Sequence, residues 1–410
     1  MEKLKKKLGP MALCALFALN IGYYFDLAYS PVWNQIYAYY ADAPSAILDY
    51  VATGPQFFIF LGAVFCAWLV TRASKKTVLI FCSGLFCVTG LIMGVVDNVY
   101  YLAVMRSISG FSIGGMAPTS IALIVEFNRD DERKCNTLTG VYNGVGAVIG
   151  GLIALIAGIL CVSAWKNVFG MYWISVLMLA LVIIFVPHTP AEKSQIEQGD
   201  LATAPEKWSK WPMIATLASM FVISIFYMIS VVGISFFVDE NGLGDASLAG
   251  LYSSLATFAG AIGAFMYPMI ERKIKRATPI LFYSCEAVGF LLLFITNNLI
   301  TPGLAVCLCG YAYSMSMTYY MMYVTKVVPP SHVSSSINLV TAALSIGSFL
   351  SAYAFTGMMI VAGTDLHSQV MPYVGVICLV CIALAIILTI SAKKKASAAT
   401  EKAPIAAEKE

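Results

Sequence analysis

Charged residues are scarce in this sequence. Asp, Glu, Lys and Arg make up 11% of the 410 residues, whereas 60% are hydrophobic and the mean hydropathy is +0.81. A soluble domain carries about 25% charged residues, so this chain has too little polar surface to coat a water-soluble globule. Apolar runs of about 20 residues, each long enough to cross a bilayer as a helix, recur from end to end. The sequence predicts a multi-pass protein of the lipid bilayer, with no nucleic acid among its partners.

Several signatures of chemistry are also missing. The sequence has no nucleotide-binding G-x-x-x-x-G-K-[ST] loop, and none of its three histidines has a second ligand at metal spacing. Most of the eleven cysteines fall inside apolar runs, where a thiol is usually a small packing residue. Gly110–Gly114 spells G-x-S-x-G, but that hydrolase motif needs a strand–turn–helix elbow and here lies inside an apolar run. We expect no enzyme activity, no metal and no cofactor.

The apolar runs and the positive charges predict the topology. We expect an all-α membrane protein with twelve transmembrane helices, at roughly 11–31, 48–70, 77–96, 100–125, 137–160, 165–187, 212–238, 246–270, 279–297, 301–326, 334–361 and 370–391. All of the 25 Lys and Arg except Arg106 and Lys166 fall in the two tails or in the loops that alternate onto one side. Positive charge is retained on the cytoplasmic side, so both termini are expected to be cytoplasmic.

A polar stretch and an internal repeat divide the chain into two halves. His188–Lys210 is the longest polar segment between predicted helices. Sliding the sequence over itself by 200 residues aligns the basic loop 71–76 with 271–276, and Gly110 with Gly310. The halves therefore point the same way in the membrane, as parallel repeats. We expect an N-terminal six-helix bundle (1–187), a cytoplasmic linker (188–211), a C-terminal six-helix bundle (212–392) and a disordered cytoplasmic tail (393–410).

Local motifs resemble those of the major facilitator superfamily of secondary transporters. The loop A-W-L-V-T-R-A-S-K-K, at 67–76, and its repeat at 267–276 are similar to the family's basic loop after helix 2. Helix 4 carries R-x-x-x-G-x-x-x-G from Arg106, and helix 5 carries G-A-V-I-G-G at 146–151, which resembles the G-P-x-x-G-G of the drug–proton antiporter branch. The resemblance implies a substrate site between the halves, in a cavity lined by helices 1, 4, 7 and 10.

The resemblance also implies roles for two groups of residues. The loops imply a cytoplasmic gate motif of Arg72, Lys75, Lys76, Glu271, Arg272 and Arg276. The glycines at helical spacing imply close helix packing at Gly110, Gly114, Gly146, Gly150 and Gly151. Thr71 replaces the acid of the first loop motif, so the latch between the halves is expected to rest on Glu271. Ala147 replaces the proline of the helix 5 motif, which weakens the inference of antiport.

A charged pair is expected inside the N-terminal half. An arginine at the bilayer centre costs about 2.5–3.5 kcal/mol on insertion scales, so Arg106 needs water or an acid. At about 1.5 Å per residue, Arg106 lies about 9 Å below the outer start of its helix, and Asp26 stands about 24 Å above the cytoplasmic start of helix 1. The two charges are thus at similar depth in a hydrocarbon core of about 30 Å. We interpret Asp26 and Arg106 as a proton-coupling pair, with a purely structural pair as the alternative.

The C-terminal half offers a different lining. It has Phe226 and Val306 where the repeat would place Asp26 and Arg106. Aromatic and Met stripes are often simple packing, but on helices that line a cavity they also suit a flat, amphipathic organic molecule. The expected cavity residues are Tyr23, Tyr24, Tyr227, Tyr313, Met317 and Tyr320.

Three further charges lie within predicted helices or at their ends. Glu286 is inside helix 9, which is peripheral in the fold that the resemblance implies, so a structural hydrogen bond or an interhelical contact is the favoured interpretation. Glu126 and Lys326 end helices 4 and 10 on the cytoplasmic side. A gating salt bridge between them is an option, although charges at interfacial depth need no special reason.

The combined prediction is a secondary active transporter that works by alternating access. Proton-coupled export of a small amphipathic or drug-like molecule is the favoured interpretation. Uptake or exchange of a small organic anion, with Arg106 binding its carboxylate, is the alternative. The loops are short and no N-x-[ST] sequon occurs, which favours a bacterial cell membrane. We also expect a monomer.

Overall fold

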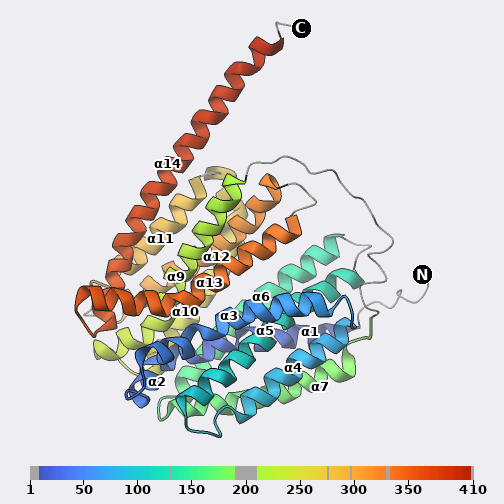
Figure 1. The fold of residues 1–410 in the computed structure, drawn as a ribbon, viewed down its shortest axis with the longest axis vertical. Coiled ribbons are helices and arrows are strands. Elements are labelled where there is room, and N and C mark those ends of the chain that lie inside the picture. The colour runs from blue at the N-terminus through green and yellow to red at the C-terminus, as the bar shows by residue number, and fades with distance from the viewer. Residues whose placement is uncertain are drawn as a thin grey trace.

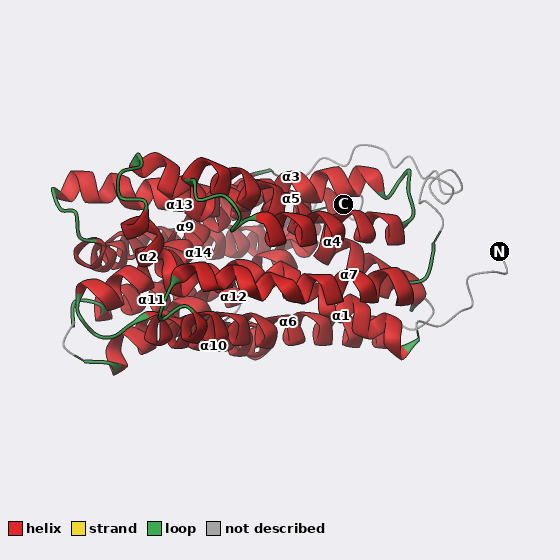
Figure 2. Ribbon diagram, turned by 90° about the horizontal axis from the view of Figure 1, so that it is seen from below, coloured by secondary structure: helices red, strands yellow, loops and turns green. Residues whose placement is uncertain are grey.

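The computed structural model describes residues 9–128, 132–189, 210–274, 277–295, 298–328 and 333–407, and within them every regular element is a helix (Figures 1 and 2). These elements are α1 (Pro10–Tyr24), η1 (Phe25–Val32), α2 (Trp33–Tyr39), α3 (Ser45–Leu69), α4 (Lys75–Ile92), α5 (Val99–Phe127), α6 (Glu132–Leu160), η2 (Trp165–Trp173), α7 (Ile174–Phe185), α9 (Trp211–Glu240), α10 (Ala246–Ile274), α11 (Thr278–Leu292), α12 (Ile300–Val327), α13 (Val333–Ala362) and α14 (His367–Ala407).

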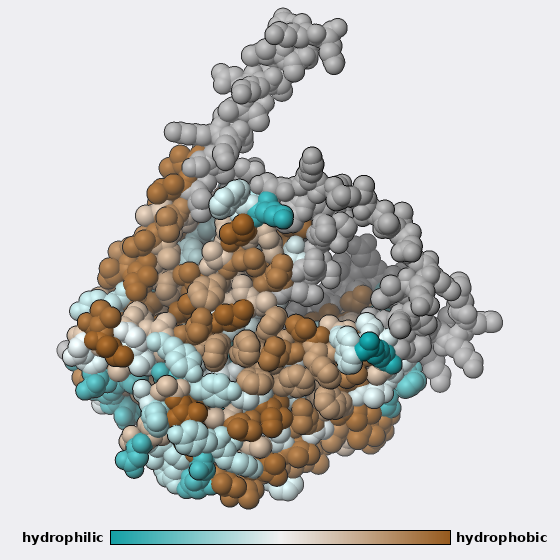
Figure 3. All heavy atoms as spheres, viewed as in Figure 1, coloured by the Kyte–Doolittle hydropathy of each residue, from teal (hydrophilic) through white to brown (hydrophobic). Residues whose placement is uncertain are grey.

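The twelve predicted spans are confirmed. The segments α1–η1–α2 form the first span and η2–α7 the sixth, while each of the other ten is a single helix. Nine of the spans, among the described residues, have by themselves the length and hydropathy to cross a membrane. Hydrophobic residues cover most of the face in Figure 3, and the most hydrophilic ones lie towards the ends of the helices. This distribution is that of a protein whose flank is solvated by lipid.

The first span differs from the predicted helix at 11–31. It continues to Tyr39 and passes through the 3-10 segment η1. Pro31 lies inside η1 and lacks the backbone N–H that a regular helical hydrogen bond needs. A 3-10 stretch inside a longer helix often marks a hinge or a functional site. Asp26 is the second residue of this stretch.

The C-terminal end also differs from the prediction. Helix α14 continues to Ala407, although we expect a disordered tail from residue 393. Residues 393–407 are rich in Ala and Lys, which have high helix propensity. The predicted linker at 188–211 lies mostly outside the described residues.

Each half is organised around its own core. Tyr29, Phe86 and Tyr172 are fully buried in the core of the N-terminal half, and Phe282 and Phe290 in that of the C-terminal half. The repeat is visible in the packing, because α5 lies against α3 as α12 lies against α10. The two bundles therefore share one backbone plan, as the sequence repeat predicts.

The halves meet at the outer end of the molecule. Their helices lie together at the lower left of Figure 1 and diverge towards the upper right. The Ser30 hydroxyl donates to the carbonyl oxygen of Val231 over 2.8 Å, and the Thr53 hydroxyl donates to that of Phe349 over 2.7 Å. Both contacts join the halves on the side opposite to the basic loops. The structure is therefore closed towards the outside.

Candidate functional site

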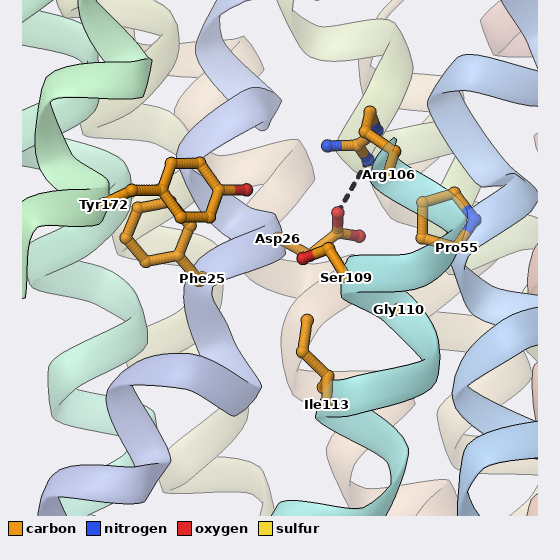
Figure 4. Close-up of a pocket in the computed structure, with 8 residues that line it drawn as sticks. All are labelled: Phe25, Asp26, Pro55, Arg106, Ser109, Gly110, Ile113 and Tyr172. Atoms are coloured by element: carbon orange, nitrogen blue, oxygen red, sulfur yellow. Dashed lines mark hydrogen bonds and ion pairs between the residues drawn. The ribbon is translucent and has the colours of Figure 1, made fainter. Parts of the chain in front are cut away.

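Arg106 is buried in the N-terminal half and its donors are occupied. The side chain is 2% exposed. Its Nη2 donates to Oδ1 of Asp26 over 2.7 Å, and its Nε donates to the carbonyl oxygen of Val51 over 2.7 Å. The structure thus brings Asp26 and Arg106 together, as their depths predict (Figure 4). It adds a backbone partner that the sequence analysis did not consider.

A proline makes that backbone partner available. Val51 lies in α3, four residues before Pro55. In a regular helix the N–H of residue 55 would donate to the carbonyl of residue 51, but proline has no N–H. The Val51 carbonyl is left without its helical donor, and Arg106 supplies one. Since an unsatisfied carbonyl in a membrane costs several kcal/mol, the proline and the arginine stabilise each other's position.

Aromatic rings cover the faces of the guanidinium. The guanidinium carbon of Arg106 lies 4.0 Å from the ring centroid of Tyr29 and 5.0 Å from that of Trp33. The Tyr29 hydroxyl is in turn 3.0 Å from that of Tyr172. Cation–π contacts are strongest where water is excluded. This cage replaces the hydration shell that the cation would have in water.

Asp26 is the accessible member of the pair. Its side chain is 20% exposed, and its second oxygen, Oδ2, accepts a hydrogen bond of 2.9 Å from Nε2 of Gln56. A small cavity beside the carboxylate has room for about one water molecule. Figure 4 shows Phe25 and Tyr172 on one side of the carboxylate, with Pro55 beyond the arginine on the other. Asp26 is therefore more accessible than Arg106, although both side chains line the cavity.

Four of the six expected cavity residues meet between the halves. The rings of Tyr227 and Tyr313 stack with their centroids 3.9 Å apart and their planes 7° from parallel. Tyr23 and Tyr24 make an edge contact with centroids 5.1 Å apart. Tyr313 lies within electrostatic range of both of them, and Tyr23 is exposed. Each half therefore contributes one aromatic pair to what we call the tyrosine cluster.

The other two expected cavity residues lie in the core of the C-terminal half. The Tyr320 hydroxyl makes a short hydrogen bond with that of Ser219, which is 2.6 Å from the Tyr283 hydroxyl. Met317 is partly buried against the same core. Tyr313 and Tyr320 lie on the same face of α12, because seven residues make almost two full helical turns, but Tyr320 lies about 10 Å further along the helix, where that face packs into the core. Tyr320 is a core residue rather than a cavity residue.

The basic loops form ion pairs within each half. Nζ of Lys75 is 2.6 Å from Oε2 of Glu126, and both side chains are buried. In the C-terminal half Lys326 forms an ion pair with Glu271, and both side chains are partly exposed. The optional bridge between Glu126 and Lys326 is therefore wrong for this conformation. Likewise, Glu271 binds inside its own half instead of latching the halves together.

The other residues of the predicted gate motif are Arg72, Lys76, Arg272 and Arg276. The Arg72 guanidinium carbon lies 4.1 Å from the ring centroid of Trp68, one turn earlier in the chain. Lys76 is partly exposed and Arg272 is exposed. Arg276 lies outside the described residues. The gate function of this loop stays a prediction.

The glycines assigned to packing all lie at close contacts. An added Cβ would come within 3 Å of a neighbouring atom at each of Gly110, Gly114, Gly146, Gly150 and Gly151. At Gly114 the neighbour is the carbonyl oxygen of Ile59 in α3, at 2.0 Å. At Gly146 it is the ring of Tyr24, at 2.5 Å, so the helix 5 glycines make room for a tyrosine of the cluster.

Glu286 makes an interhelical contact, which is one of the two favoured interpretations, because the Cys309 thiol of α12 lies beside its carboxyl. It lies in α11 with 0% of its surface exposed, and neither carboxyl oxygen has a hydrogen bond of normal geometry among the described residues.

No cluster of three or more His, Cys, Asp or Glu suited to a metal occurs in the described part of the chain. Gln56 and the Val51 carbonyl were not predicted as site residues, although Pro55 inside a predicted span was an available signal.

Comparisons with known proteins agree on the family. The model described as Major Facilitator Superfamily matches residues 11–352. A bacterial homologue of the human lysosomal transporter Spinster, solved in an inward-facing and unoccupied conformation, is 14% identical with a TM-score of 0.73, over 95% of this chain and 98% of that one. The D-xylose–proton symporter is 13% identical with a TM-score of 0.68, over 91% and 96% of the two chains. At these identities the likeness shows the fold alone.

A short match to one curated protein points the same way. Over 97 residues the chain is 32% identical to svop-1 of Caenorhabditis elegans, which is described as a transporter. The match covers 23% of this chain and 18% of that relative. The chain thus spans under a fifth of the relative's length, and nothing about the relative's substrate follows for this chain.

Proposed function

The chain belongs to the major facilitator superfamily, and on that premise we propose that it is a proton-coupled exporter of small amphipathic organic molecules. The fold is that of secondary transporters that work by alternating access. The observation that carries the coupling is the ion pair between Asp26 and Arg106, inside a membrane-spanning bundle and next to the tyrosine cluster. We place the protein in the cell membrane of a bacterium.

The geometry supports a proton switch at Asp26. An ionised Asp26 is stabilised by Arg106 and Gln56, which donate to its two oxygens. Protonation removes the negative charge, weakens the bond to Arg106 and leaves a neutral carboxyl in a half-buried site. An adjacent cation favours the ionised form of a carboxylic acid, whereas burial favours the neutral one. A rocking motion that changes the exposure of Asp26 would alternate between these two effects and load or release the proton.

The same geometry disfavours the alternative function. To bind the carboxylate of an organic anion, Arg106 would have to expose its donors, yet it is 2% exposed and its guanidinium is engaged by Asp26, Val51 and two aromatic rings. The exposed acceptor of the site is the Asp26 carboxylate. A substrate that competes with a proton for that carboxylate would be neutral or cationic, with an aromatic or aliphatic body suited to the tyrosine cluster.

Export is supported by two features of the site. The helix 5 glycines resemble the motif of the drug–proton antiporter branch, and in the structure Gly146 and Gly150 accommodate Tyr24 of the cluster. Antiport also follows from competition, because a substrate and a proton that share Asp26 occupy it in turn. With an inward proton gradient, such an exchange drives the substrate outward.

Transport in proteoliposomes tests this function. Counterflow across a mixed library that includes tetraphenylphosphonium, neutral aromatics and carboxylates identifies the substrate class, and exchange of carboxylates alone would favour the alternative. Asp26→Asn keeps the shape of the side chain but cannot bind a proton, so it should abolish uphill transport driven by a pH gradient while counterflow persists. Asp97→Asn, on the outer surface, is the matched control and should retain both. Unchanged pH-driven transport in Asp26→Asn would remove Asp26 from the mechanism.

A further inference from the structure

Glu286 is a buried acid that the proposed function does not use. It lies near the middle of α11, about 12 Å from the cytoplasmic start of that helix. The side chain has no exposed surface, and Oε1 and Oε2 both lack hydrogen-bond partners in the described structure. Native proteins contain few such groups, and each one calls for a physical explanation.

Among the described residues, the surroundings of Glu286 contain thiols and phenols but no cation. Cys309 of α12 lies beside the carboxyl, and Cys378 of α14 and Tyr227 of α9 are within electrostatic range. Cys285 and Tyr283 are its neighbours on α11 itself. A thiol is at best a weak hydrogen-bond donor. None of these groups, which face Glu286 from every helix packed closely on α11, compensates a negative charge.

The basic residues of this half lie too far along their helices to act as partners. Among the described residues, Arg272 and Lys326 are at the cytoplasmic ends of α10 and α12, and His367 begins α14 at the outer end. His367 is bound by Glu240, whose Oε1 is 3.1 Å from its Nδ1. An ionised carboxylate without partner or water is very costly in an apolar interior. Glu286 therefore carries a proton in this conformation.

Packing does not require a carboxyl at this position. The repeat places Phe86 of the N-terminal half at the equivalent site, where it is buried and packs against Tyr172. An apolar residue, Phe86, fits this position in the N-terminal half. An acid at the same position of the C-terminal half is therefore not needed for packing, and its burial costs free energy. Ionisable residues inside membrane spans are usually functional for this reason.

Tyr227 is the group that relates Glu286 to the tyrosine cluster. It is an electrostatic neighbour of Glu286, and its ring stacks on that of Tyr313 with the centroids 3.9 Å apart. A movement that separates these two rings would change the packing beside Glu286 and give water a way to it.

We propose that Glu286 is a second proton-binding site, located in the C-terminal half, loaded in this conformation and connected to the central cavity through Tyr227. When the ring pair opens, the Glu286 carboxyl gives its proton to cavity water and remains as a carboxylate; when the pair closes again, it takes a proton back. Proton binding at Glu286 stands independently of the proposed function. Its use in coupling rests on that function.

Infrared difference spectroscopy of the full-length protein tests the protonation directly. At neutral pH the wild type should show the carbonyl stretching band of a neutral carboxylic acid, which Glu286→Gln should remove and Asp26→Asn should retain. Glu286→Gln keeps the size of the side chain, and Glu286→Phe copies the other half if the glutamine variant does not fold. A wild-type spectrum without the band, or a band that survives both substitutions of Glu286, would overturn the proposal.

Labelling with an apolar carbodiimide provides a second readout that needs no variant of Glu286. The reagent reacts with protonated carboxyls in apolar surroundings, so mass spectrometry should find the adduct on Glu286 at neutral pH and lose it at alkaline pH. Asp26 should stay unlabelled in the wild type and gain label in Arg106→Val, which shows that the reagent reports protonation. Label on Asp26 in that variant with none on Glu286 would contradict the proposal. Because neither readout measures transport, their failure is distinct from failure of the proposed function.

Discussion

The two halves share a backbone plan but handle charge in different ways. In the N-terminal half, Asp26 and Arg106 form an ion pair within a cage of aromatic rings. The repeat-related residues of the C-terminal half are Phe226 and Val306, both buried and apolar, and the fully buried acid among the described residues of this half is Glu286, whose carboxyl oxygens have no hydrogen-bond partner there. The two halves therefore share their packing and differ in their electrostatics.

The difference bears on how a rocking transporter can use protons. In the proposed cycle, Asp26 exchanges its proton when its ion pair with Arg106 is loosened. Glu286 exchanges its proton when water reaches its apolar site. One movement would therefore act on the two acids in different ways, through an ion pair in one half and through hydration in the other.

The largest loss of stability and of transport is expected from replacing Arg106, the buried cation of the N-terminal half. Arg106→Val copies Val306 and leaves Asp26 and the Val51 carbonyl without their donor. Breaking a buried ion pair costs about 3–5 kcal/mol, so the free energy of unfolding should fall by that amount and pH-driven transport should disappear. Thermal unfolding in detergent and proteoliposome transport measure the two effects.

Two controls sharpen that test. Val306→Leu, at the equivalent site of the other half, should cost about 1–3 kcal/mol because it only adds a methylene to a packed apolar site. Asp26→Asn combined with Arg106→Val should recover part of the stability, since no unpaired acid remains. Equal losses in Arg106→Val and Val306→Leu would show that the ion pair contributes nothing specific.

The cytoplasmic ion pairs give the second comparison. Lys75 and Glu126 are 2% and 4% exposed, whereas Lys326 and Glu271 are 53% and 28% exposed. Glu126→Gln should therefore lower the free energy of unfolding by about 3 kcal/mol. Glu271→Gln should lower it by less than about 1 kcal/mol, because exposed pairs are weak. Thermal unfolding at low and high salt checks both values, and a larger loss for Glu271→Gln would reverse this account of the two loops.

The close helix crossings should behave alike in both halves. An added Cβ would lie 2.5 Å from the Pro55 carbonyl oxygen at Gly110 and 2.1 Å from the Ala256 carbonyl oxygen at Gly310. Overpacking of this kind costs about 1–3 kcal/mol, so Gly110→Ala and Gly310→Ala should destabilise to a similar degree. Thermal unfolding of the two variants measures it. A silent substitution at either glycine would mean that the crossings are not equivalent.

The smallest effect is expected at the outer loops. The hydrogen bond from Lys166, with that from Tyr39, lowers the pKa of Asp97 to about 2. In the C-terminal half, the positions related by the repeat to Asp97 and Lys166 are occupied by Asn297 and Leu366. Asp97→Asn should thus cost no more than about 1 kcal/mol, since the pair is exposed.

The pH dependence of the stability of Asp97→Asn tests the direction in which the Asp97 carboxylate contributes. Because the pKa of Asp97 is lower in the folded state than the value of about 3.9 in an unfolded chain, its contribution is complete above pH 4 or so and is lost as the pH falls through about 2. The difference in melting temperature between wild type and Asp97→Asn should therefore shrink on acidification from pH 4. A difference that grows on acidification would contradict the assignment.

The fold and part of the site could be predicted because they depend on simple geometry. The rise per residue of a helix places Asp26 and Arg106 at similar depth whatever the neighbours are. The rotation of each helix about its axis is set by tertiary packing, so the contact of Arg106 with Val51 could not be predicted. Packing also decides what surrounds each level of a helix, because Tyr313 lies at the tyrosine cluster whereas Tyr320, on the same face of α12, lies in the core.

Charged residues at helix ends were harder to pair. The idea of a bridge from Glu126 to Lys326 considered only two helix ends, and each charge is instead neutralised by the neighbouring loop of its own half. The repeat contained this information. In the N-terminal half the loop supplies a cation, Lys75, to an acid at a helix end, and in the C-terminal half the related loop supplies an acid, Glu271, to a cation at a helix end. For Glu286 the sequence favoured a structural hydrogen bond or an interhelical contact, and only the packing identifies the neighbouring group as the Cys309 thiol of α12.

The central claim is that a substrate and a proton compete for Asp26. Its most direct test measures the affinity of the detergent-solubilised protein for the strongest counterflow compound as the pH is lowered. The account predicts that the affinity of the wild type falls on acidification, because a proton displaces the compound from Asp26, and that the affinity of Asp26→Asn does not change with pH. The same pH dependence in both proteins would contradict it.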